Sequence, residues 1–192
     1  YPGFIFATAG IHPNYSADLT ESQTIELAEL AAQPEVVAIG EIGLDYYRDY
    51  ATPQQQLTAL EIQLSLAQKL DFPIVIHERD SAHELVPILV NWWQNLPEST
   101  RIKHNPGVMH AYSADLSYVN TLLECGFCFG IGGPVTYKNA SEKQALVASL
   151  PLEKMLLETD CPFMPPHPYR GQRNEPAFIP LIAQKISDLR GL

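Results

Sequence analysis

Long apolar runs are missing from this sequence of 192 residues, and no charged start leads into an apolar stretch. Neither a transmembrane helix nor a secretory signal is therefore predicted, and we expect a cytoplasmic protein that makes no contact with a membrane. Cysteine is scarce, with three residues in the chain. Cys125 and Cys128 adjoin an apolar run, where thiols are usually buried and reduced, and no second ligand pair accompanies them. A redox or zinc role for this pair is therefore not favoured.

Basic residues are also fewer than acidic residues in this sequence. The chain has 12 Lys and Arg residues against 22 Asp and Glu residues, which gives a net charge of -10. Proteins that coat nucleic acid neutralise phosphates over a broad basic face, and this composition argues against that class. Carboxylates gathered around divalent cations have their charge compensated, so an acidic chain can still turn a locally positive site toward a phosphate. An enzyme that handles phosphate through bound metal ions therefore stays open.

Short apolar runs alternate with longer amphipathic stretches, a pattern typical of parallel strands joined by helices. Six strands are predicted, at residues 4–9, 36–39, 73–76, 107–109, 127–131 and 155–157. The predicted helices cover residues 20–32, 54–70, 81–95, 117–124 and 142–149, and another begins near Glu175. Capping residues such as Thr20, Ser81 and Ser141 mark several helix starts. The pattern indicates an α/β fold.

The number of βα units narrows the architecture. A closed barrel of this kind needs eight units and is typically about 250 residues long. Six units in 192 residues fit either an open, doubly wound sheet or a TIM-type (β/α)8 barrel with about six of its eight units in this chain. We favour the barrel because of the motifs described below. No repeat or linker interrupts the chain, so a single barrel domain is predicted over residues 1–192. Because the chain begins at Tyr1 without methionine and a helix is predicted to run to Leu192, we expect this domain to be truncated at both ends.

Polar motifs recur immediately after the predicted strands. They are Gly10-Ile11-His12-Pro13, Gly40-Glu41-Ile42-Gly43-Leu44-Asp45, His77-Glu78-Arg79-Asp80, His110-Ala111-Tyr112-Ser113 and Glu158-Thr159-Asp160. In parallel α/β folds the carboxyl ends of the strands converge on one face, where sites are built. Side chains far apart in the sequence are therefore expected to meet there.

Two imidazoles and two carboxylates stand out among these motifs: His77, His110, Glu41 and Asp160. This mixture of donors suits divalent cations such as Zn²⁺, Mn²⁺ or Mg²⁺. A carboxylate can bridge two ions, an imidazole can complete each shell, and such a pair of ions can activate a water. A single histidine at a strand end is more often structural, but four such residues at successive strands favour a metal site.

The motifs together resemble those of the TatD-related metal-dependent deoxyribonucleases, within the wider group of amidohydrolase-like barrels. The resemblance covers nearly the whole chain in order, and the combination of motifs is highly specific. It is carried by Gly-Ile-His-Pro (His12), Gly-Glu-Ile-Gly-Leu-Asp (Glu41), Ile-His-Glu-Arg (His77), Val-Met-His-Ala-Tyr-Ser (His110), Ile-Gly-Gly (Gly132, Gly133), Glu-Thr-Asp-Cys-Pro (Asp160) and Arg-Gly-Gln-Arg-Asn-Glu-Pro (residues 170–176).

The resemblance implies a site for two divalent metal ions, Mg²⁺, Mn²⁺ or Zn²⁺. Glu41 would bridge the two ions, His77 and His110 would bind one of them, and Asp160 would belong with the other. The family completes that second site with a His-x-His pair on the first barrel strand, and this sequence has no such pair. The family also places two βα units ahead of the Gly-x-His-Pro strand. This number matches the two units that a closed barrel of eight would need in addition to the six predicted here.

The implied activity is a hydrolase that cleaves phosphodiester bonds of DNA, with RNA as an open alternative, as a 3′ to 5′ exonuclease. Water activated by the metal ions attacks the phosphate, with Glu41 and Asp160 as catalytic residues and Asp160 as the proton acceptor. Nucleic acid is then the expected partner, as substrate, and no stable protein partner is inferred.

Candidate substrate-binding residues lie beside these ligands. Arg170 and Arg173 bracket a turn after the last predicted strand, in a position to reach phosphate oxygens with forked donors, while Arg79 and His12 are on other strand-end loops. A salt bridge that fastens the loop is an equally good interpretation of each arginine. Tyr46, Tyr47 and Tyr50 can stack on unpaired bases or simply cover the barrel rim. Asp45 is interpreted as structural, and Glu175 as a residue near the start of the last helix.

Two other functions stay open. The same activated water serves a metal-dependent amidohydrolase or esterase that acts on a carbonyl substrate, such as a cyclic amide or an aminoacyl-tRNA ester. If the native protein has no His-x-His pair at all, the other alternative is a binding protein with impaired catalysis.

Overall fold

The computed structural model describes residues 1–17, 19–112 and 116–192, so Ser113 of the His110 motif lies outside the described residues. Its sheet contains six strands, all parallel, in the order in which they occur along the chain. The predicted number and direction of the strands are therefore confirmed. The strands are β1 (Ala7–Ala9), β2 (Val36–Asp45), β3 (Ile74–Arg79), β4 (Gly107–Met109), β5 (Cys128–Ile131) and β6 (Met155–Leu157).

A helix follows each strand, so every connection is a crossover between parallel neighbours. The helices are α1 (Glu21–Ala31), α2 (Pro53–Leu70), α3 (Ala82–Gln94), α4 (Arg101–His104), α5 (Val119–Glu124), α6 (Ser141–Ser149) and α7 (Ile179–Arg190). Short 3₁₀ helices include η1 (Pro13–Tyr15), η3 (Gly133–Thr136) and η5 (Pro176–Phe178). Six helices were expected, and the additional one is the single turn of α4 before β4.

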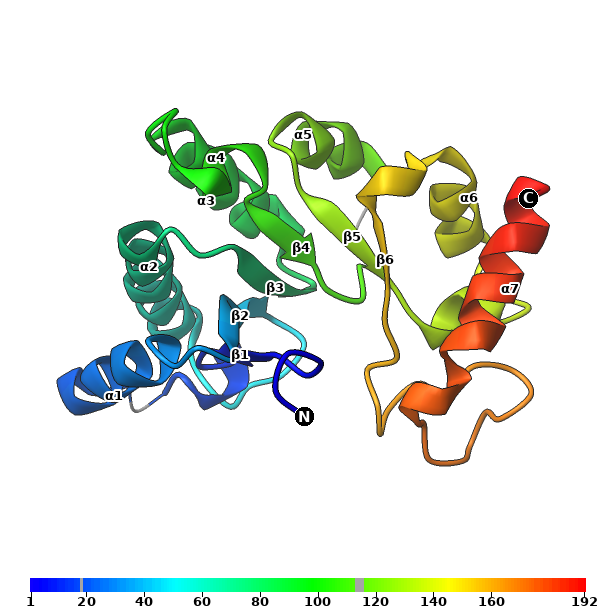
Figure 1. The fold of residues 1–192 in the computed structure, drawn as a ribbon, viewed down its shortest axis with the longest axis horizontal. Helices are drawn as coiled ribbons and strands as arrows, with labels where there is room; N and C mark the ends of the chain where they lie inside the picture. Colours follow the sequence, from blue (N-terminus) through cyan, green and yellow to red (C-terminus); the bar gives the residue numbers. More distant parts are fainter. Residues whose placement is uncertain (18, 113–115) are drawn as a thin grey trace.

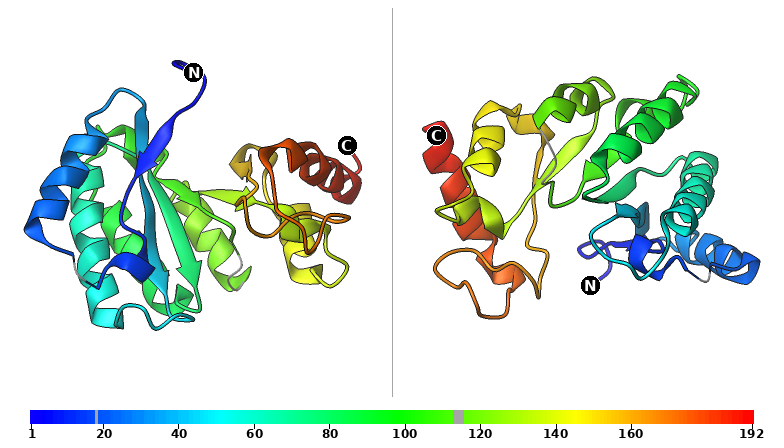
Figure 2. Two further views of the ribbon diagram at one scale, coloured as in Figure 1. Left: turned by 90° about the horizontal axis from the view of Figure 1, so that it is seen from below. Right: turned by 180° about the vertical axis from the view of Figure 1, so that it is seen from behind.

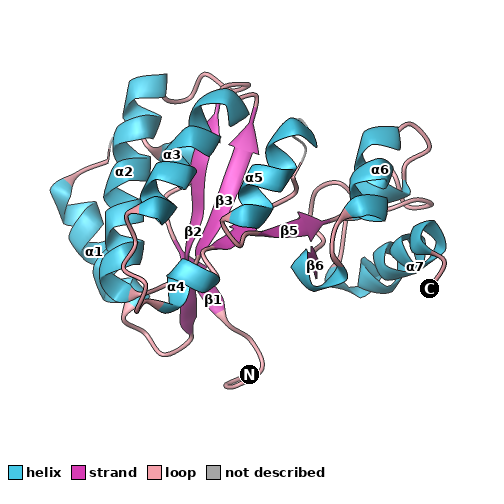
Figure 3. Ribbon diagram, turned by 90° about the horizontal axis from the view of Figure 1, so that it is seen from above, coloured by secondary structure: helices cyan, strands magenta, loops and turns pink. Residues whose placement is uncertain are grey.

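The strands form the inner layer of an arc and the helices its outer layer (Figure 1). In the view of Figure 3, α1, α2 and α3 lie on one side of β2 and β3, and α5 lies beside β3 on the other. The other two views show β1 and the N-terminus at one end of the arc, with α6 and α7 at the other (Figure 2). β1 and β6 are the two edge strands of the described sheet. This is the partial barrel that six of eight units predict.

The core fills the space between the sheet and the helices. Ile39 and Ile42 on β2, and Ile74 and Ile76 on β3, are completely buried, as is Leu89 on α3. In β3 these isoleucines alternate with Val75 and His77, because successive side chains of a strand point to opposite faces. The face opposite the helices is therefore left for the polar residues of the motifs.

The edges of the sheet are apolar but uncovered. Phe4, Ile5 and Phe6 lie before β1 and are exposed, although the sequence predicted that they belong to that strand. Leu156 and Leu157 of β6 are about half exposed, at 48% and 46%. Among the described residues no helix is both long and apolar enough to cross a membrane.

Of four predictions about helix ends, one is confirmed and three need correction. Thr20 caps α1 as predicted, in a reciprocal arrangement with Gln23. Ser81 precedes α3, but its hydroxyl donates to the Leu44 carbonyl and does not cap the helix. Ser141 is the first residue of α6 and not its cap. The last helix does not run to Leu192, because α7 ends at Arg190 and Gly191 takes a left-handed conformation.

Candidate metal centre

Glu41 lies at the middle of the candidate centre, within β2. The sequence placed Glu41 and His77 just after their strands, and this was wrong, because β2 continues to Asp45 and β3 to Arg79. The two strands pair along this extension, with Gly43 opposite His77 and Asp45 opposite Arg79. The pairing brings Glu41 and His77 onto the same inner face of the sheet.

Three imidazoles surround one oxygen of Glu41. Its Oε1 lies 2.8 Å from Nδ1 of His77, 3.9 Å from Nε2 of His12 and 4.0 Å from Nε2 of His110. These histidines come from the segments that follow or form three different strands, β1, β3 and β4. The predicted convergence of Glu41, His77 and His110 is therefore seen in the structure, and His12 is part of it.

Asp45 orients His77 from the side opposite Glu41. Its Oδ2 lies 3.0 Å from Nε2 of His77, so this nitrogen carries a proton toward the carboxylate and Nδ1 faces Glu41. Its Oδ1 accepts hydrogen bonds from the backbone N–H groups of Tyr47 and Arg48, each at 3.0 Å. Asp45 was expected to order the loop, and its contact with His77 was not predicted.

Glu158 has the same role for His110, although no role was predicted for Glu158. Its Oε2 lies 2.8 Å from Nδ1 of His110, and its Oε1 accepts the backbone N–H of Ala111 at 2.8 Å. The other ring nitrogen, Nε2, faces Glu41 and lies 3.5 Å from Oδ1 of Asp160. A side chain at Gly130 would collide with the Glu158 carboxylate, so the glycine makes room for this contact.

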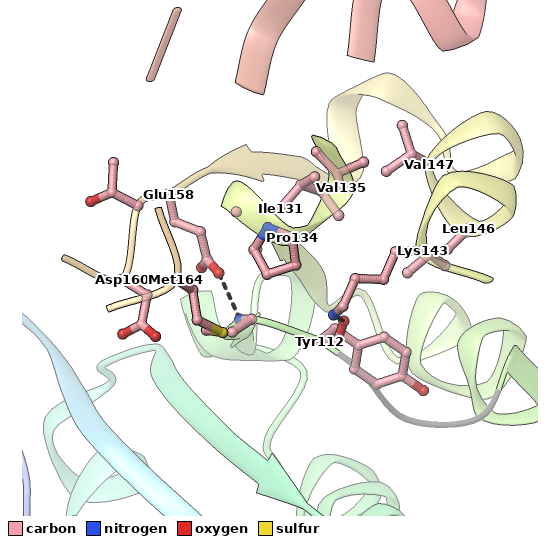
Figure 4. A pocket seen from close by; sticks show the side chains of 14 residues that line it. Tyr112, Ile131, Pro134, Val135, Lys143, Leu146, Val147, Glu158, Asp160 and Met164 are labelled. Carbon is pink, nitrogen blue, oxygen red and sulfur yellow. Dashed lines mark hydrogen bonds between the residues drawn. The ribbon is translucent and has the colours of Figure 1, made fainter. Parts of the chain in front are cut away.

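Figure 4 shows Glu158 and Asp160 on one side of the pocket and Lys143, next to Tyr112, on the other. The Lys143 ammonium donates to the Tyr112 carbonyl at 2.7 Å, and burial lowers the pKa of this lysine. The enclosed cavity has a volume of about 20 Å³. That is room for about one water, so this cavity is not a substrate pocket.

The electrostatics of the centre favour ionised groups. Burial opposes ionisation of Glu41, but the hydrogen bond from His77 and the charges of the three imidazoles outweigh it and lower the pKa of Glu41. Burial likewise disfavours a charged His110, yet its contacts with Asp160 and Glu158 and the charge of Glu41 raise the pKa of His110 to about 10. Without a metal, the centre is thus a network of carboxylates paired with imidazolium groups.

His12 differs from the other two histidines. Its Nδ1 accepts the backbone N–H of Asn14 at 3.1 Å, so a neutral ring carries its proton on Nε2, toward Glu41. Burial and the neighbouring His77 lower the pKa of His12, which favours this neutral form. His12 is therefore arranged as a hydrogen-bond donor to the centre.

The donor set fits a divalent cation. His77 and His110 each place one ring nitrogen against a carboxylate and turn the other toward Glu41, which is how metal-binding histidines are usually oriented. One ligand atom from each of His12, Glu41 and His77 lies within 4.8 Å of the other two. The mixture of nitrogen and carboxylate oxygen suits Zn²⁺ or Mn²⁺, and the carboxylates also suit Mg²⁺.

The sequence model of the TatD-related DNase family matches residues 1–192. This chain belongs to that family. It is 37% identical over 187 residues to the uncharacterized metal-dependent hydrolase YabD of Bacillus subtilis, and covers 70% of that protein. It is 35% identical over 195 residues to the 3′-5′ ssDNA/RNA exonuclease TatD of Erwinia billingiae, and covers 72% of it. These matches take in 97% and 99% of the present chain.

Solved structures agree. The TatD homolog YJJV of Escherichia coli K12 superposes with a TM-score of 0.83 at 32% identity, over 96% of this chain and 68% of that one. A TatD family hydrolase of Entamoeba histolytica gives 0.81 at 26% identity, over 97% and 68%. Like the curated relatives, these proteins are longer than the present TatD-related chain.

The arginines predicted to bind substrate do not join the cluster directly. The Arg79 guanidinium lies over the ring of Tyr47, with its carbon 3.7 Å from the ring centroid, and that of Arg170 lies 4.3 Å over Tyr137. Arg173 lines an open cavity of about 360 Å³ together with Cys161. Within the described parts of this TatD-related chain, none of these arginines forms the salt bridge considered as the alternative.

Two buried amides, those of Gln63 and Asn174, hold the loops of the TatD-related centre, and no role was predicted for Gln63. Gln63 of α2 accepts the Ile11 N–H at 2.6 Å and donates to the Ile11 carbonyl at 3.1 Å, which fixes the residue before His12. Asn174, which lies just before Glu175, is 1% exposed and donates to the backbone carbonyls of Thr159 and Phe163. Asn174 thereby ties the loop that carries Arg170 and Arg173, which we call the arginine loop, to the segment that carries Asp160.

Proposed function

We propose that this chain forms the centre of a divalent-metal-dependent phosphodiesterase that degrades DNA, and single-stranded RNA as well, from the 3′ end. The observation that carries the proposal is the arrangement of three imidazoles around one Glu41 oxygen, with two of them held by further carboxylates. The exonuclease names of the TatD relatives support the choice of substrate.

Glu41, His77 and His110 would hold one divalent ion, and Glu41 and Asp160 would contribute to a second. Such ions lower the pKa of a water and stabilise the charge of the phosphoryl oxygens when they are bound. Mg²⁺, Mn²⁺ and Zn²⁺ all suit these donors. Within residues 1–192 the second ion would have Glu41 and Asp160 as ligands, because this sequence contains no His-x-His pair.

The side chains around the ions have separate tasks in hydrolysis. Asp160 is partly exposed, with 30% of its side-chain surface accessible, and would accept a proton from the attacking water. His12, with a proton on Nε2, would donate a hydrogen bond to a nonbridging phosphate oxygen. Asp45 and Glu158 keep His77 and His110 in their orientations throughout.

The substrate would approach from the side of the arginine loop. The cavity beside Arg173 has a volume of about 360 Å³, within the range of small-ligand sites. Arg170 is held over Tyr137 with its guanidinium unpaired in the described structure, so its donors are available for phosphate. Both arginines would then bind the polynucleotide near the reacting phosphate.

Glu41→Gln tests the proposal. The variant keeps the shape of the side chain but removes the charge that faces the three imidazoles, so we expect divalent-ion affinity and hydrolysis of a single-stranded oligonucleotide both to be lost while the circular dichroism spectrum is kept. Ion binding is measured by calorimetry with Mn²⁺ and hydrolysis by gel. Glu61→Gln, on the exposed side of α2, is the matched control.

Near-normal turnover by Glu41→Gln would exclude the central role of this carboxylate. If the unmodified protein binds Mn²⁺ but cuts neither an oligonucleotide nor a small phosphodiester, the phosphodiesterase proposal fails. Hydrolysis of a carboxylic ester or cyclic amide under the same conditions would then favour the carbonyl-hydrolase alternative.

A further inference from the structure

A group of three exposed residues lies beside the metal centre and has no part in the chemistry described above. The Tyr47 ring is 58% exposed. The guanidinium carbon of Arg79 lies 3.7 Å from the centroid of this ring, and that of Arg48 lies 5.3 Å from it. We call Tyr47, Arg48 and Arg79 the Tyr47 platform.

Strand register places this platform next to His77. Arg79 is two residues after His77 in β3, so both side chains point to the same face of the sheet. Asp45, the last residue of β2, pairs with Arg79 in the register of the two strands. The Tyr46 N–H donates to the Arg79 carbonyl at 2.9 Å, which joins the two strand ends. The platform is thus a continuation of the centre and not a separate surface.

One carboxylate couples the platform to the centre. Asp45 is buried, and its two oxygens serve different partners. Oδ2 contacts His77, while Oδ1 accepts the backbone N–H groups of both Tyr47 and Arg48. The position of the platform is therefore fixed relative to a metal-binding histidine by a single rigid side chain.

The hydrogen-bond donors of the two guanidinium groups are free. In the described part of the chain, Arg101 is paired with Asp71 and Arg190 donates to backbone carbonyls, whereas Arg48 and Arg79 have neither an ion pair nor a side-chain hydrogen bond. Two unpaired cations held together on a protein with a net charge of -10 are a local site for anions. The aromatic ring supports the guanidinium planes and leaves their N–H edges available for phosphate.

We propose that the Tyr47 platform binds the sugar–phosphate backbone and an unpaired base of a single-stranded nucleic acid, next to the phosphate that is cut. A guanidinium stacked on an aromatic ring can take a base against its outer face and a phosphate at its edge, which a duplex does not allow because its bases are paired and stacked. This proposal rests on the proposed function, because it assigns a subsite of the same enzyme.

Binding without hydrolysis tests the platform. The probe is a short, fluorescein-labelled, single-stranded oligothymidylate with phosphorothioate linkages, measured by anisotropy with Mn²⁺ and again in EDTA. Arg79→Ala and Arg48→Ala should each weaken binding about tenfold, the scale of a charge-assisted hydrogen bond. Each should also lower the slope of log affinity against log salt by about 0.7, the contribution of one phosphate contact on a single strand.

Three further variants separate the platform from a general effect of charge or folding. Tyr47→Ala removes the support of both guanidinium groups and should weaken binding, whereas Tyr47→Phe keeps the ring and should bind like the unmodified protein. Arg101→Ala removes an equal charge from an arginine that is paired with Asp71 before β4, and should leave binding and its salt slope unchanged. Unchanged binding in Arg79→Ala and Arg48→Ala, or an equal loss in Arg101→Ala, would overturn the proposal.

Hydrolysis distinguishes failure of the platform from failure of the proposed function. In Arg79→Ala, kcat/KM for the natural oligonucleotide should fall by about tenfold more than kcat/KM for bis(p-nitrophenyl) phosphate, which is too short to reach the platform. Equal losses on both substrates would show that Arg79 supports the fold and would overturn the platform. Platform-dependent binding of the probe by a protein that hydrolyses neither substrate would instead leave the platform standing and overturn the enzyme.

Discussion

Each histidine that faces Glu41 from β3 or β4 depends on a second carboxylate. Asp45 holds His77, and Glu158 holds His110. Each of these acids also accepts a backbone N–H from a loop of the centre. The ring orientation and the loop conformation are therefore coupled, and loss of either acid should disturb a proposed ligand histidine without removing any proposed ligand.

Glu158→Gln should lower metal affinity and kcat/KM by about 10- to 100-fold, the usual scale for a carboxylate that orients a ligand histidine. The amide removes the charge that holds Nδ1 of His110, while it keeps an acceptor for the Ala111 N–H. Calorimetry with Mn²⁺ and oligonucleotide hydrolysis measure the two quantities. Glu98→Gln, whose side chain is 80% exposed, should change neither. Equal behaviour of the two variants would contradict the orienting role.

The pKa of His110 predicts how the stability of the metal-free protein depends on pH. The folded protein raises the pKa of His110 to about 10 from the ordinary histidine value of 6.5, so the folded state binds the proton more tightly than the unfolded state. The stabilisation is fully present below about pH 6.5 and is lost as the pH rises toward about 10. Thermal unfolding in EDTA should therefore show a falling melting temperature across this range. His110→Gln should flatten the decline, and an unchanged slope would contradict this assignment.

Chemical type and order along the chain were enough to predict that Glu41, His77 and His110 converge. The contact of Glu158 with His110 could not be predicted, because it joins residues 48 positions apart and depends on the space left by Gly130. The sequence predicted Arg79 as a candidate substrate-binding residue on a strand-end loop, but did not predict that it contacts Tyr47. Its contact with Tyr47 depends on the pairing of β2 with β3 beyond the predicted strand ends.

At the level of elements, α2 does more than cover the sheet. Gln56 and Gln63 lie on its buried face among apolar neighbours. Gln56 accepts the Asp45 N–H at 2.8 Å and donates to the Asp45 carbonyl at 2.9 Å, and Gln63 makes the equivalent pair of bonds with Ile11. One helix thus satisfies the backbone of two loops that carry site residues.

Gln63→Leu should lower the free energy of unfolding by about 1 to 3 kcal/mol, because the Ile11 N–H and carbonyl lose their partners in a partly buried place. Urea unfolding measures this change. Gln68→Leu, on the exposed side of the same helix, is the matched control and should stay within about 0.5 kcal/mol of the unmodified protein. A stability loss in the control as large as that in Gln63→Leu would point to a general effect of leucine in α2.

Helices were predicted more accurately than strands, for a physical reason. Helix ends are determined by residues close together in the sequence, as in the reciprocal caps of Thr20 with Gln23 and of Thr52 with Gln55. A strand ends where its hydrogen bonds to the neighbouring strand stop, and the length of an apolar run in the sequence does not reveal that position. The predicted strand at residues 36–39 therefore stopped short of Glu41, whereas β2 continues through the motif.

For the whole molecule, the acidic composition predicts how binding to nucleic acid responds to salt. With a net charge of -10, affinity should come from a few arginines and not from a broad basic face. If Arg48, Arg79, Arg170 and Arg173 each contact one phosphate, the slope of log affinity against log salt in EDTA should be about 3, at about 0.7 per contact. Fluorescence anisotropy over a range of KCl concentrations measures it. A slope of about 6 or more would require a basic surface that this chain does not supply.

The six strands and their parallel direction could be predicted from the alternation of apolar and amphipathic segments alone. The choice between an open sheet and a partial barrel needed the family motifs, because both architectures share this alternation. A single domain over residues 1–192, truncated at both ends, stays a prediction.

The strands that carry the residues of the centre differ in how easily they are expected to open locally. β2 and β3 have neighbours on both sides and carry Glu41 and His77, so we expect the segments that hold these residues to be among the last to open. β6 has three residues, whereas β2 has ten, and the segment after β6 carries Asp160. Local opening of this short strand would free Asp160 while Glu41 and His77 keep their places. A ligand that engages Asp160 would then also hold the segment after β6 in place, so part of its binding energy would be spent on ordering the chain.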